Sequence, residues 1–231
     1  MIVYGRNVAK EYLKNPKKIE KIILQDGFDD KSILSLMENS DLNIKYMSKR
    51  EIDNLSDGVH QGIMLYVSDY KYALLDDVLK TDPKFIVILD HIEDPHNFGA
   101  IIRTCEALGI DGIIIPNDRS VTINGTVVKT SVGAIYNMPI IKVVNLGNTI
   151  EKLKDIGYWI VGTDMIGTDY TEIDYNMPIC LVIGNEGKGI SKLIKDNCDF
   201  MATIPMSGNI NSLNASVSCG IVLSRIVASR K

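Results

Sequence analysis

The sequence predicts an α/β protein with two parts: a small N-terminal α/β unit and a larger region built on a parallel β-sheet. After Lys84, short continuous apolar runs alternate with helical segments, which is typical of parallel strands buried on both faces. The first 70 residues alternate shorter helix and strand patterns. With 231 residues, 45% hydrophobic and 23% charged, the composition is that of a globular protein and excludes disordered, collagen-like and coiled-coil chains.

The N-terminal unit is predicted to contain three helices and three strands in alternation. The helices are expected at 5–15, 30–39 and 48–55, and the strands at 21–24, 42–47 and 59–67. Asp30 and Ser48 are placed to cap the second and third helices, and Glu51 completes a capping-box pattern with Ser48. Residues 71–83 form a short amphipathic stretch closed by Pro83, which we interpret as a linker or docking helix.

The region from residue 84 to 231 supplies the parallel strands. These apolar runs are expected at 85–89, 112–116, 139–144, 159–163, 179–184 and 201–205. Helices are expected at 97–108, 147–156 and 190–197, with a last one from near Ser212 toward the C-terminus.

Charge and cysteine content narrow the function classes. The net charge is −4 and the pI about 5.4, so any binding of a polyanion must be local. Residues 1–21 hold six Lys or Arg against two Glu, which fits a solvated helix face or an RNA-contacting patch equally well. The four cysteines have no C-x-x-C spacing, which predicts free, reduced thiols. No apolar run approaches about 18 residues and the N-terminus has no apolar core, so we expect a cytoplasmic protein without membrane contact.

Polar segments follow three of the predicted strands, where parallel sheets bind ligands. The first, 90–100, leads into a helix that carries Asn97 near its start and Arg103 further on. Asn97 is a candidate helix cap, and Arg103 a candidate ion-pair partner of Glu106 or Asp90. A metal site is the weakest interpretation of this loop, because all of its ligands would come from one short segment, so we expect no metal.

The other two segments are a glycine-rich turn at 181–191 and a loop at 204–218 crowded with small polar residues. Glycines in the turn allow a ligand to approach the backbone, although neither the P-loop nor the dinucleotide-binding spacing is present. The loop has more polar residues than one helix cap requires, which suggests a bound polar ligand or an elaborate N-cap.

In this order, the three segments resemble the motifs of the SpoU, or TrmH, family of RNA ribose 2′-O-methyltransferases in the SPOUT superfamily. The resemblance is carried by N-x-G-x-x-x-R from Asn97, by G-x-E-G-x-G from Gly184, and by I-P-M-x-G-x-x-x-S-L-N-x-S from Ile204. The segments IPNDRS (115–120) and WIVGT (159–163), and the opening YGRNVAKEYL, extend it over nearly the whole chain. It is closest to the RlmB-like group, which methylates a guanosine in 23S rRNA.

The resemblance implies an L30e-like RNA substrate-binding domain at 1–70, a linker at 71–83, and a methyltransferase domain at 84–231 with a deep trefoil knot. It also implies a homodimer that binds S-adenosyl-L-methionine. The implied cofactor residues are Thr163, Gly184, Ile204 and Leu213. The implied catalytic residues are Asn97, Arg103, Glu186, Ser212 and Asn214, with Arg103 beside the ribose hydroxyl as an orienting and phosphate-binding group rather than a base.

The implied function is methyl transfer to a ribose 2′-hydroxyl, with 23S rRNA as the expected partner. Transfer RNA is the alternative substrate, and a non-catalytic RNA-binding protein of the same fold is the alternative class. A nucleotide-dependent oxidoreductase would need a glycine fingerprint after the strand at 85–89, which is absent. The group that accepts the hydroxyl proton stays open.

Overall fold

The computed structural model describes residues 1–14, 16–38, 40–56, 58–210 and 212–229. The internal contacts divide the chain into two compact units. Unit 1 comprises residues 1–71 with 123–133, and unit 2 comprises residues 72–122 with 134–231. Within the described ranges, no helix combines the length and the apolar character needed to cross a bilayer.

Unit 1 contains a four-stranded sheet in the order β1-β4-β2-β3. The central strand β4 (Ile63–Val67) is antiparallel to β1 (Ile2–Tyr4) and to β2 (Ile19–Gln25), and β2 is parallel to β3 (Ile44–Met47). The helices of the unit are α1 (Arg6–Leu13), the 3₁₀ turn η1 (Pro16–Lys18), α2 (Lys31–Met37), α3 (Lys49–Asp53) and α6 (Gly125–Ser131).

Both predicted helix caps of unit 1 are confirmed. The Asp30 carboxylate accepts hydrogen bonds from the backbone N–H groups of Ser32 and Ile33 at the start of α2. At the start of α3, the Ser48 hydroxyl accepts from the Glu51 N–H and the Glu51 carboxylate accepts from the Ser48 N–H, which is a complete capping box. Because each cap satisfies N–H groups that the helix leaves free, the two short helices have defined starting points.

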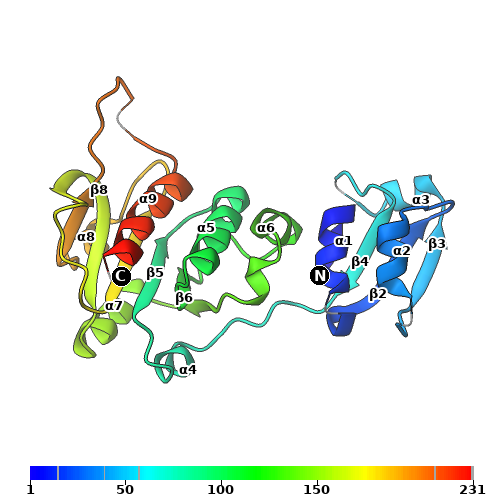
Figure 1. Ribbon diagram of the computed structural model, residues 1–231, viewed down its shortest axis with the longest axis horizontal. Helices are drawn as coiled ribbons and strands as arrows, with labels where there is room; N and C mark the ends of the chain where they lie inside the picture. Colours follow the sequence, from blue (N-terminus) through cyan, green and yellow to red (C-terminus); the bar gives the residue numbers. More distant parts are fainter. Residues whose placement is uncertain (15, 39, 57, 211, 230–231) are drawn as a thin grey trace. The chain divides into compact units, whose positions relative to one another are not determined.

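Unit 2 contains a six-stranded sheet in the order β10-β8-β9-β5-β6-β7, in which every pair is parallel (Figure 1). The strands are β5 (Phe85–Asp90), β6 (Gly112–Pro116), β7 (Ile140–Val143), β8 (Trp159–Asp169), β9 (Ile179–Gly184) and β10 (Phe200–Thr203). The helices are α4 (Leu75–Leu79), α5 (Pro95–Ala107), the 3₁₀ turn η2 (Ala134–Tyr136), α7 (Leu146–Asp155), α8 (Lys192–Lys195) and α9 (Ala215–Ala228). The predicted parallel sheet is therefore confirmed.

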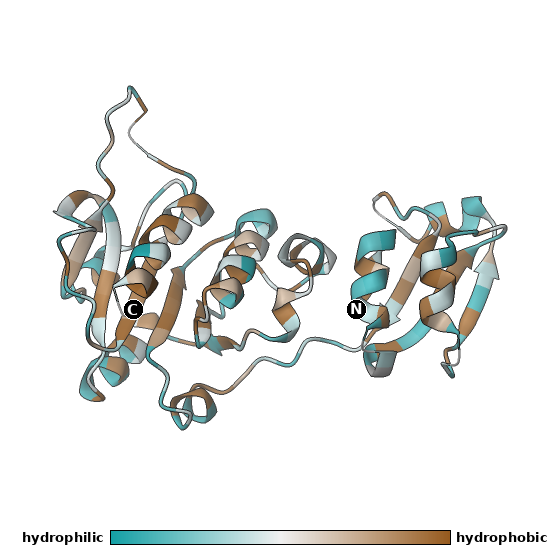
Figure 2. Cartoon of the chain, in the orientation of Figure 1, coloured by the Kyte–Doolittle hydropathy of each residue, from teal (hydrophilic) through white to brown (hydrophobic). Residues whose placement is uncertain are grey.

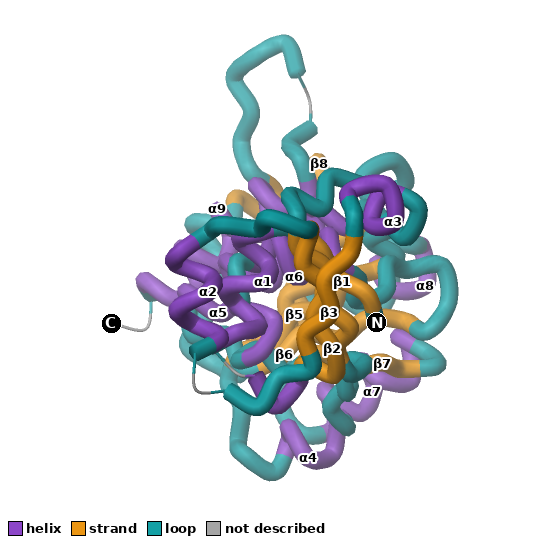
Figure 3. The backbone as a smooth tube through the Cα atoms, turned by 90° about the vertical axis from the view of Figure 1, so that its right-hand side faces the viewer, coloured by secondary structure: helices purple, strands orange, loops and turns teal. Residues whose placement is uncertain are grey.

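Helices cover both faces of this sheet. The helices α5 and α9 lie side by side on one face, and α7 and α8 lie on the other (Figures 1 and 3). The inner strands β5, β6 and β9 are strongly hydrophobic (Figure 2), because both of their faces are buried. Alternate strand residues such as Ile88 and Val182 pack with Ile150 of α7 and Ile194 of α8 in one core cluster.

Some predicted boundaries were wrong. The last helix begins at Ala215 instead of Ser212, the helix expected at 190–197 is the short α8, and β8 extends six residues past Thr163 to Asp169. The strand β1 and the helix α6 were not predicted. In the predicted loop at 204–218, Asn211 lies outside the described residues.

Candidate active site

The site lies where the order of the sheet reverses. From β5, the chain places β6 and β7 on one side and β9, β8 and β10 on the other. In the β5–β9 pair, Asp90 lies opposite Gly184, so the first two polar segments start side by side at the carboxyl edge. Open parallel sheets bind ligands at such a switch point, because the neighbouring loops diverge there and leave a crevice.

The glycine-rich turn after β9 is folded tightly on itself. The N–H and carbonyl groups of Asn185 and Gly189 bond each other reciprocally at 3.1 and 2.8 Å. A Cβ atom at Gly184 would lie 2.2 Å from the Gly189 carbonyl carbon, so only glycine fits there. The Asn185 side chain accepts the N–H groups of Gly187 and Lys188 and donates to the His91 carbonyl at 2.8 Å, which ties the turn to the loop after β5.

Asp90 fixes the same junction from inside the protein. Its side chain is 1% exposed, and its carboxylate accepts the Ser191 N–H at 2.7 Å and bonds the His91 ring at 2.6 Å. His91 has a left-handed backbone with φ 60°, which a residue other than glycine adopts only when its surroundings hold it there. Sequence reasoning gave no positioning role to Asp90 or Asn185, although both directly follow apolar strand runs.

Three of the predicted catalytic residues form one hydrogen-bonded chain. The Asn97 amide, in the first turn of α5 and 7% exposed, donates to the Glu186 carboxylate at 2.6 Å. The Asn214 amide donates to the Asn97 carbonyl oxygen at 2.8 Å. Asn214 also caps α9 by accepting the Ser216 and Val217 N–H groups, while the cap of α5 is Asp94 instead of Asn97. Asn97 thus joins the three polar segments.

A pocket of about 640 Å³ opens beside this chain of side chains. All four predicted cofactor residues line it, namely Thr163, Gly184, Ile204 and Leu213, together with Glu186 and Ser212. Thr163 donates its hydroxyl proton to the Val182 carbonyl at 3.2 Å. The size is typical of pockets for small molecules and cofactors.

The pocket has both polar and apolar walls. Backbone atoms of the turn 184–189 line one wall, and Ile204, Met206 and Leu213 supply apolar surface for a flat ring. Asp164 and Glu186 bring carboxylates to the lining. Burial opposes ionisation of Asp164, but hydrogen bonds from Lys195 and the Ile166 N–H outweigh it and lower its pKa below the ordinary value. Lys195 pairs with Asp164 and Lys188 also lines the pocket, so the lining carries charges of both signs.

The remaining predicted residues are not joined to this network. Arg103 lies on an exposed face of α5, makes no hydrogen bond or ion pair with another described residue, and does not line the pocket. Its expected pairing with Glu106 or Asp90 is absent from the described part of the chain. Ser212 is exposed at the pocket. Among the described residues, no three His, Cys, Asp or Glu side chains are grouped so that they could hold a metal ion.

Two family models match the chain. Residues 84–224 match the SpoU rRNA methylase family, and residues 2–73 match the substrate-binding domain of RNA 2′-O ribose methyltransferases. A protein of Staphylococcus saprophyticus named as a TrmH family tRNA/rRNA methyltransferase is 44% identical, with 100% of this chain and 96% of the relative covered. YacO of Bacillus subtilis, named in the same way, is 40% identical, with 99% of this chain and 95% of the relative covered.

Solved structures share the fold. The SpoU methyltransferase AviRb of Streptomyces viridochromogenes, in complex with AdoMet, superposes with a TM-score of 0.82 at 24% identity and covers 100% of this chain and 90% of its own. The A. aeolicus TrmH/SpoU tRNA modifying enzyme superposes with a TM-score of 0.58 at 33% identity over 68% and 82%. On the family models and the full-length relatives together, the chain belongs to the SpoU/TrmH family of RNA methyltransferases.

Proposed function

We propose that the chain transfers a methyl group from S-adenosyl-L-methionine to the ribose 2′-hydroxyl of a guanosine in large-subunit (23S) rRNA. The observation that carries this proposal is the chain of hydrogen bonds from Asn214 through Asn97 to Glu186, because it ends at the pocket lined by the four residues expected to hold the cofactor. The AdoMet complexes of AviRb and of an rRNA methyltransferase from Sinorhizobium meliloti support the choice of cofactor.

We assign the binding of the cofactor to Thr163, Gly184, Ile204 and Leu213. When bound, S-adenosylmethionine supplies an electrophilic methyl group on a sulfonium. The absence of a side chain at Gly184 lets the turn 184–189 fold tightly on itself beside the pocket, and Glu186 brings a carboxylate to the lining.

The remaining residues act on the ribose side. A hydroxyl is a weak nucleophile, so most of the acceleration must come from alignment of the two reactants. Asn97 and Asn214 hold the Glu186 carboxylate at the pocket, where it can accept a hydrogen bond from the ribose. Ser212 adds a hydroxyl at the same rim. Arg103 is assigned to the RNA phosphate and the orientation of the ribose, since its planar donor fork suits phosphate and its pKa is too high for a base.

We further propose the family's architecture for this chain. It comprises an RNA-binding domain of ribosomal-protein type at 1–70, a linker at 71–83, and a knotted catalytic domain at 84–231 that forms a homodimer in the cytoplasm. The strand order of unit 2 is consistent with the knot, because β9 follows both β5 and β8 in the sequence yet lies between them in the sheet. The exposed Arg103 supports the dimer, since a second chain would give it a pocket to reach.

Ribosomal RNA is favoured over transfer RNA by the extent of the structural matches. The rRNA methyltransferase of Sinorhizobium meliloti covers 97% of this chain, whereas the tRNA enzymes cover 64–68%. The tRNA enzymes thus leave about a third of this chain uncovered, which is about the length of the matched substrate-binding domain at 2–73.

The experiment is methyl transfer from labelled S-adenosylmethionine to unmodified ribosomal RNA and, separately, to transfer RNA, with the methylated ribose then mapped. We expect label at a single 2′-O-methylguanosine of 23S rRNA. Label only in transfer RNA would overturn the substrate and keep the chemistry. If neither RNA is labelled, the assay is repeated with ribosome assembly intermediates as the substrate. No label there either would favour the non-catalytic RNA-binding protein.

A further inference from the structure

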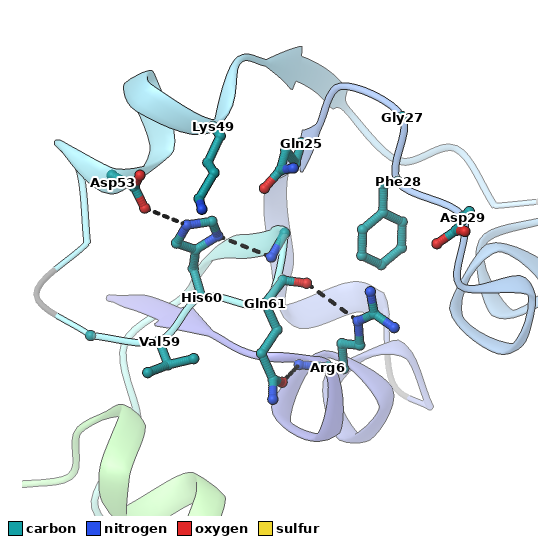
Figure 4. Close-up of a pocket in the computed structure, with 12 residues that line it drawn as sticks. Arg6, Gln25, Gly27, Phe28, Asp29, Lys49, Asp53, Val59, His60 and Gln61 are labelled. Carbon is teal, nitrogen blue, oxygen red and sulfur yellow. Dashed lines mark hydrogen bonds and ion pairs between the residues drawn. The ribbon is translucent and has the colours of Figure 1, made fainter.

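Unit 1 contains a second pocket, which none of the proposed catalytic or cofactor residues lines (Figure 4). Its volume is about 820 Å³. Arg6 of α1, Gln25 at the end of β2, Phe28 in the following loop, and Lys49 of α3 contribute side chains to it, and the loop before β4 closes the remaining wall. We call it the unit-1 pocket.

The wall before β4 is held rigidly by polar contacts. The His60 ring is 7% exposed, and its Nδ1 accepts the Gly62 N–H at 2.9 Å, so Nε2 carries the proton and donates to Asp53 at 2.8 Å. Gln61 has a left-handed backbone with φ 54°, and its carbonyl and side-chain oxygens accept from Arg6 Nε at 3.3 Å and Arg6 N at 2.8 Å. Strained backbone that is fixed by so many contacts is typical of functional sites.

Phe28 and Arg6 contact each other in the pocket. The Arg6 guanidinium carbon lies 5.3 Å from the centre of the half-buried Phe28 ring, and its Nη1 is paired with Asp30 at 3.3 Å. A Cβ atom at Gly62 would lie 3.1 Å from the Phe28 ring, so glycine leaves the room the ring needs. An aromatic ring with a guanidinium beside it offers a surface on which another flat ring can stack.

Polar groups without a partner point into the same space. The Gln25 amide and the Lys49 ammonium make no hydrogen bond or ion pair with any described residue, and Figure 4 shows both directed into the pocket with Phe28. The Gln61 side chain turns away from this space toward the start of α1, where its amide oxygen accepts the Arg6 N–H (Figure 4). The lining acids Asp29 and Asp53 balance Arg6 and Lys49, so the pocket is not simply a site for anions.

We propose that the unit-1 pocket binds one unpaired nucleotide of the RNA substrate. The base stacks on the Phe28 ring beside Arg6, the amide of Gln25 bonds its edge, and Lys49 binds the adjoining phosphate. This combination of a stacking surface, amide donors and acceptors, and a single free cation matches how proteins bind splayed-out bases. The inference rests on the proposed function, in that the ligand belongs to an RNA that the enzyme methylates.

The test is RNA binding by the full chain and three variants. Lys49→Gln removes the cation, Gln25→Leu removes the amide at similar size, and Phe28→Leu removes the aromatic plane. Lys45→Gln, on the exposed strand β3 outside the pocket, is the charge-matched control. The probe is a fluorescein-labelled single-stranded 12-nucleotide RNA of mixed sequence, compared with the same sequence in a duplex and with nucleoside 5′-monophosphates as competitors.

We expect the single strand to bind more tightly than the duplex. Phe28→Leu should weaken its binding by about five- to a hundredfold, the usual effect of losing a base-stacking contact. Lys49→Gln and Gln25→Leu should each weaken it by about two- to tenfold, the usual net effect of losing a hydrogen bond. Lys45→Gln should bind like the wild type. Wild-type binding by Lys49→Gln and Gln25→Leu would overturn the proposal even where Phe28→Leu fails to fold. Displacement of the RNA by an equal concentration of a nucleoside monophosphate would overturn the assignment to RNA.

Methyl transfer by the same samples separates this inference from the proposed function. If the pocket variants bind RNA weakly and the wild type methylates no RNA, the role of the unit-1 pocket is retained and the proposed function is overturned. If the wild type methylates RNA and the pocket variants bind and methylate it equally well, the proposed function is retained and the nucleotide-binding role of the unit-1 pocket is overturned.

Discussion

Asn97 shows how a single side chain can join distant parts of the chain. Its amide nitrogen donates to the exposed Glu186 and its oxygen accepts from the exposed Asn214, so both halves of this 7% exposed amide are used. Asn97→Asp keeps the shape but replaces the donor by a second carboxylate facing Glu186 across a contact of 2.6 Å. We expect turnover to fall at least tenfold and the free energy of unfolding to fall by about 1–3 kcal/mol.

Two facing carboxylates raise each other's pKa, and a protonated one can again donate a hydrogen bond. The destabilisation by Asn97→Asp should therefore be smaller at pH 5 than at pH 8, as measured by urea unfolding at both values. The control is Asn148→Asp, which places an acid in the exposed first turn of α7, where the helix dipole favours it. An equal effect of Asn97→Asp at both pH values would contradict the like-charge explanation.

Gly184 is limited by space, since a Cβ atom there would overlap the Gly189 carbonyl carbon and the Ile190 nitrogen at 2.2 and 2.3 Å. Gly184→Ala should open the turn 184–189 and remove the rise in melting temperature that S-adenosylmethionine gives the wild type. Gly208→Ala is the control, because nothing lies within 4 Å of its Cβ position. A normal thermal shift for Gly184→Ala would show that the turn does not shape the cofactor site.

At the scale of the element, the Asp30 cap ties helix stability to pH. Hydrogen bonds from the Ser32 hydroxyl and the Ile33 N–H lower the pKa of Asp30 below its ordinary value, although desolvation opposes them. Because the folded state favours the ionised form, this stabilisation is present above the unfolded pKa and is lost as pH falls through the folded pKa. Asp30→Asn keeps a capping oxygen and removes the charge.

The difference in unfolding free energy between wild type and Asp30→Asn should therefore be largest near neutral pH and shrink below about pH 4. Chemical denaturation across this range measures it, and Asp29→Asn, at the exposed neighbour, is the control. A difference that stays constant with pH would mean that the cap works without its charge.

The elements that could be predicted are those with a local pattern of their own. The six strands of unit 2 appear as apolar runs because both faces are buried, and the caps at Asp30 and Ser48 depend on residues within one turn. The strand β1 has three residues and owes its state to β4, about 60 residues away. The helix α6, GTVVKTS, is rich in β-branched residues, which have low helix propensity. It is helical because the burial of Val127 and Val128 outweighs that low propensity.

At the scale of the whole molecule, the residues of the site could be named from their motifs, but their arrangement could not. Asn97, Glu186 and Asn214 are up to 117 residues apart, and they meet because β9 pairs with β5 and α9 packs on α5. The exposed position of Arg103 was likewise not predictable, because the sequence gives its place on a helix but not which of its faces the rest of the unit covers.

The position of Arg103 is best explained at the level of a dimer. It is exposed, it does not line the cofactor pocket of its own chain, and it is the proposed ligand of the RNA phosphate. In a symmetric dimer, each chain offers the same surface to its partner, so Arg103 of one chain can serve the pocket of the other. We expect Arg103→Ala to lose turnover and to keep the thermal shift by S-adenosylmethionine.

Mixed dimers distinguish action across the dimer from action within one chain. One partner carries Arg103→Ala, and the other carries Leu213→Trp, which fills the pocket from a residue that is 38% exposed and so tolerant of a larger side chain. Each parent dimer should be inactive. If Arg103 acts across the dimer, a refolded equal mixture contains one complete site in each heterodimer and regains about a quarter of wild-type turnover. If it acts within its own chain, every site in the mixture has one defect and no turnover returns. The exposed position of Arg103 would then no longer be an argument for a dimer.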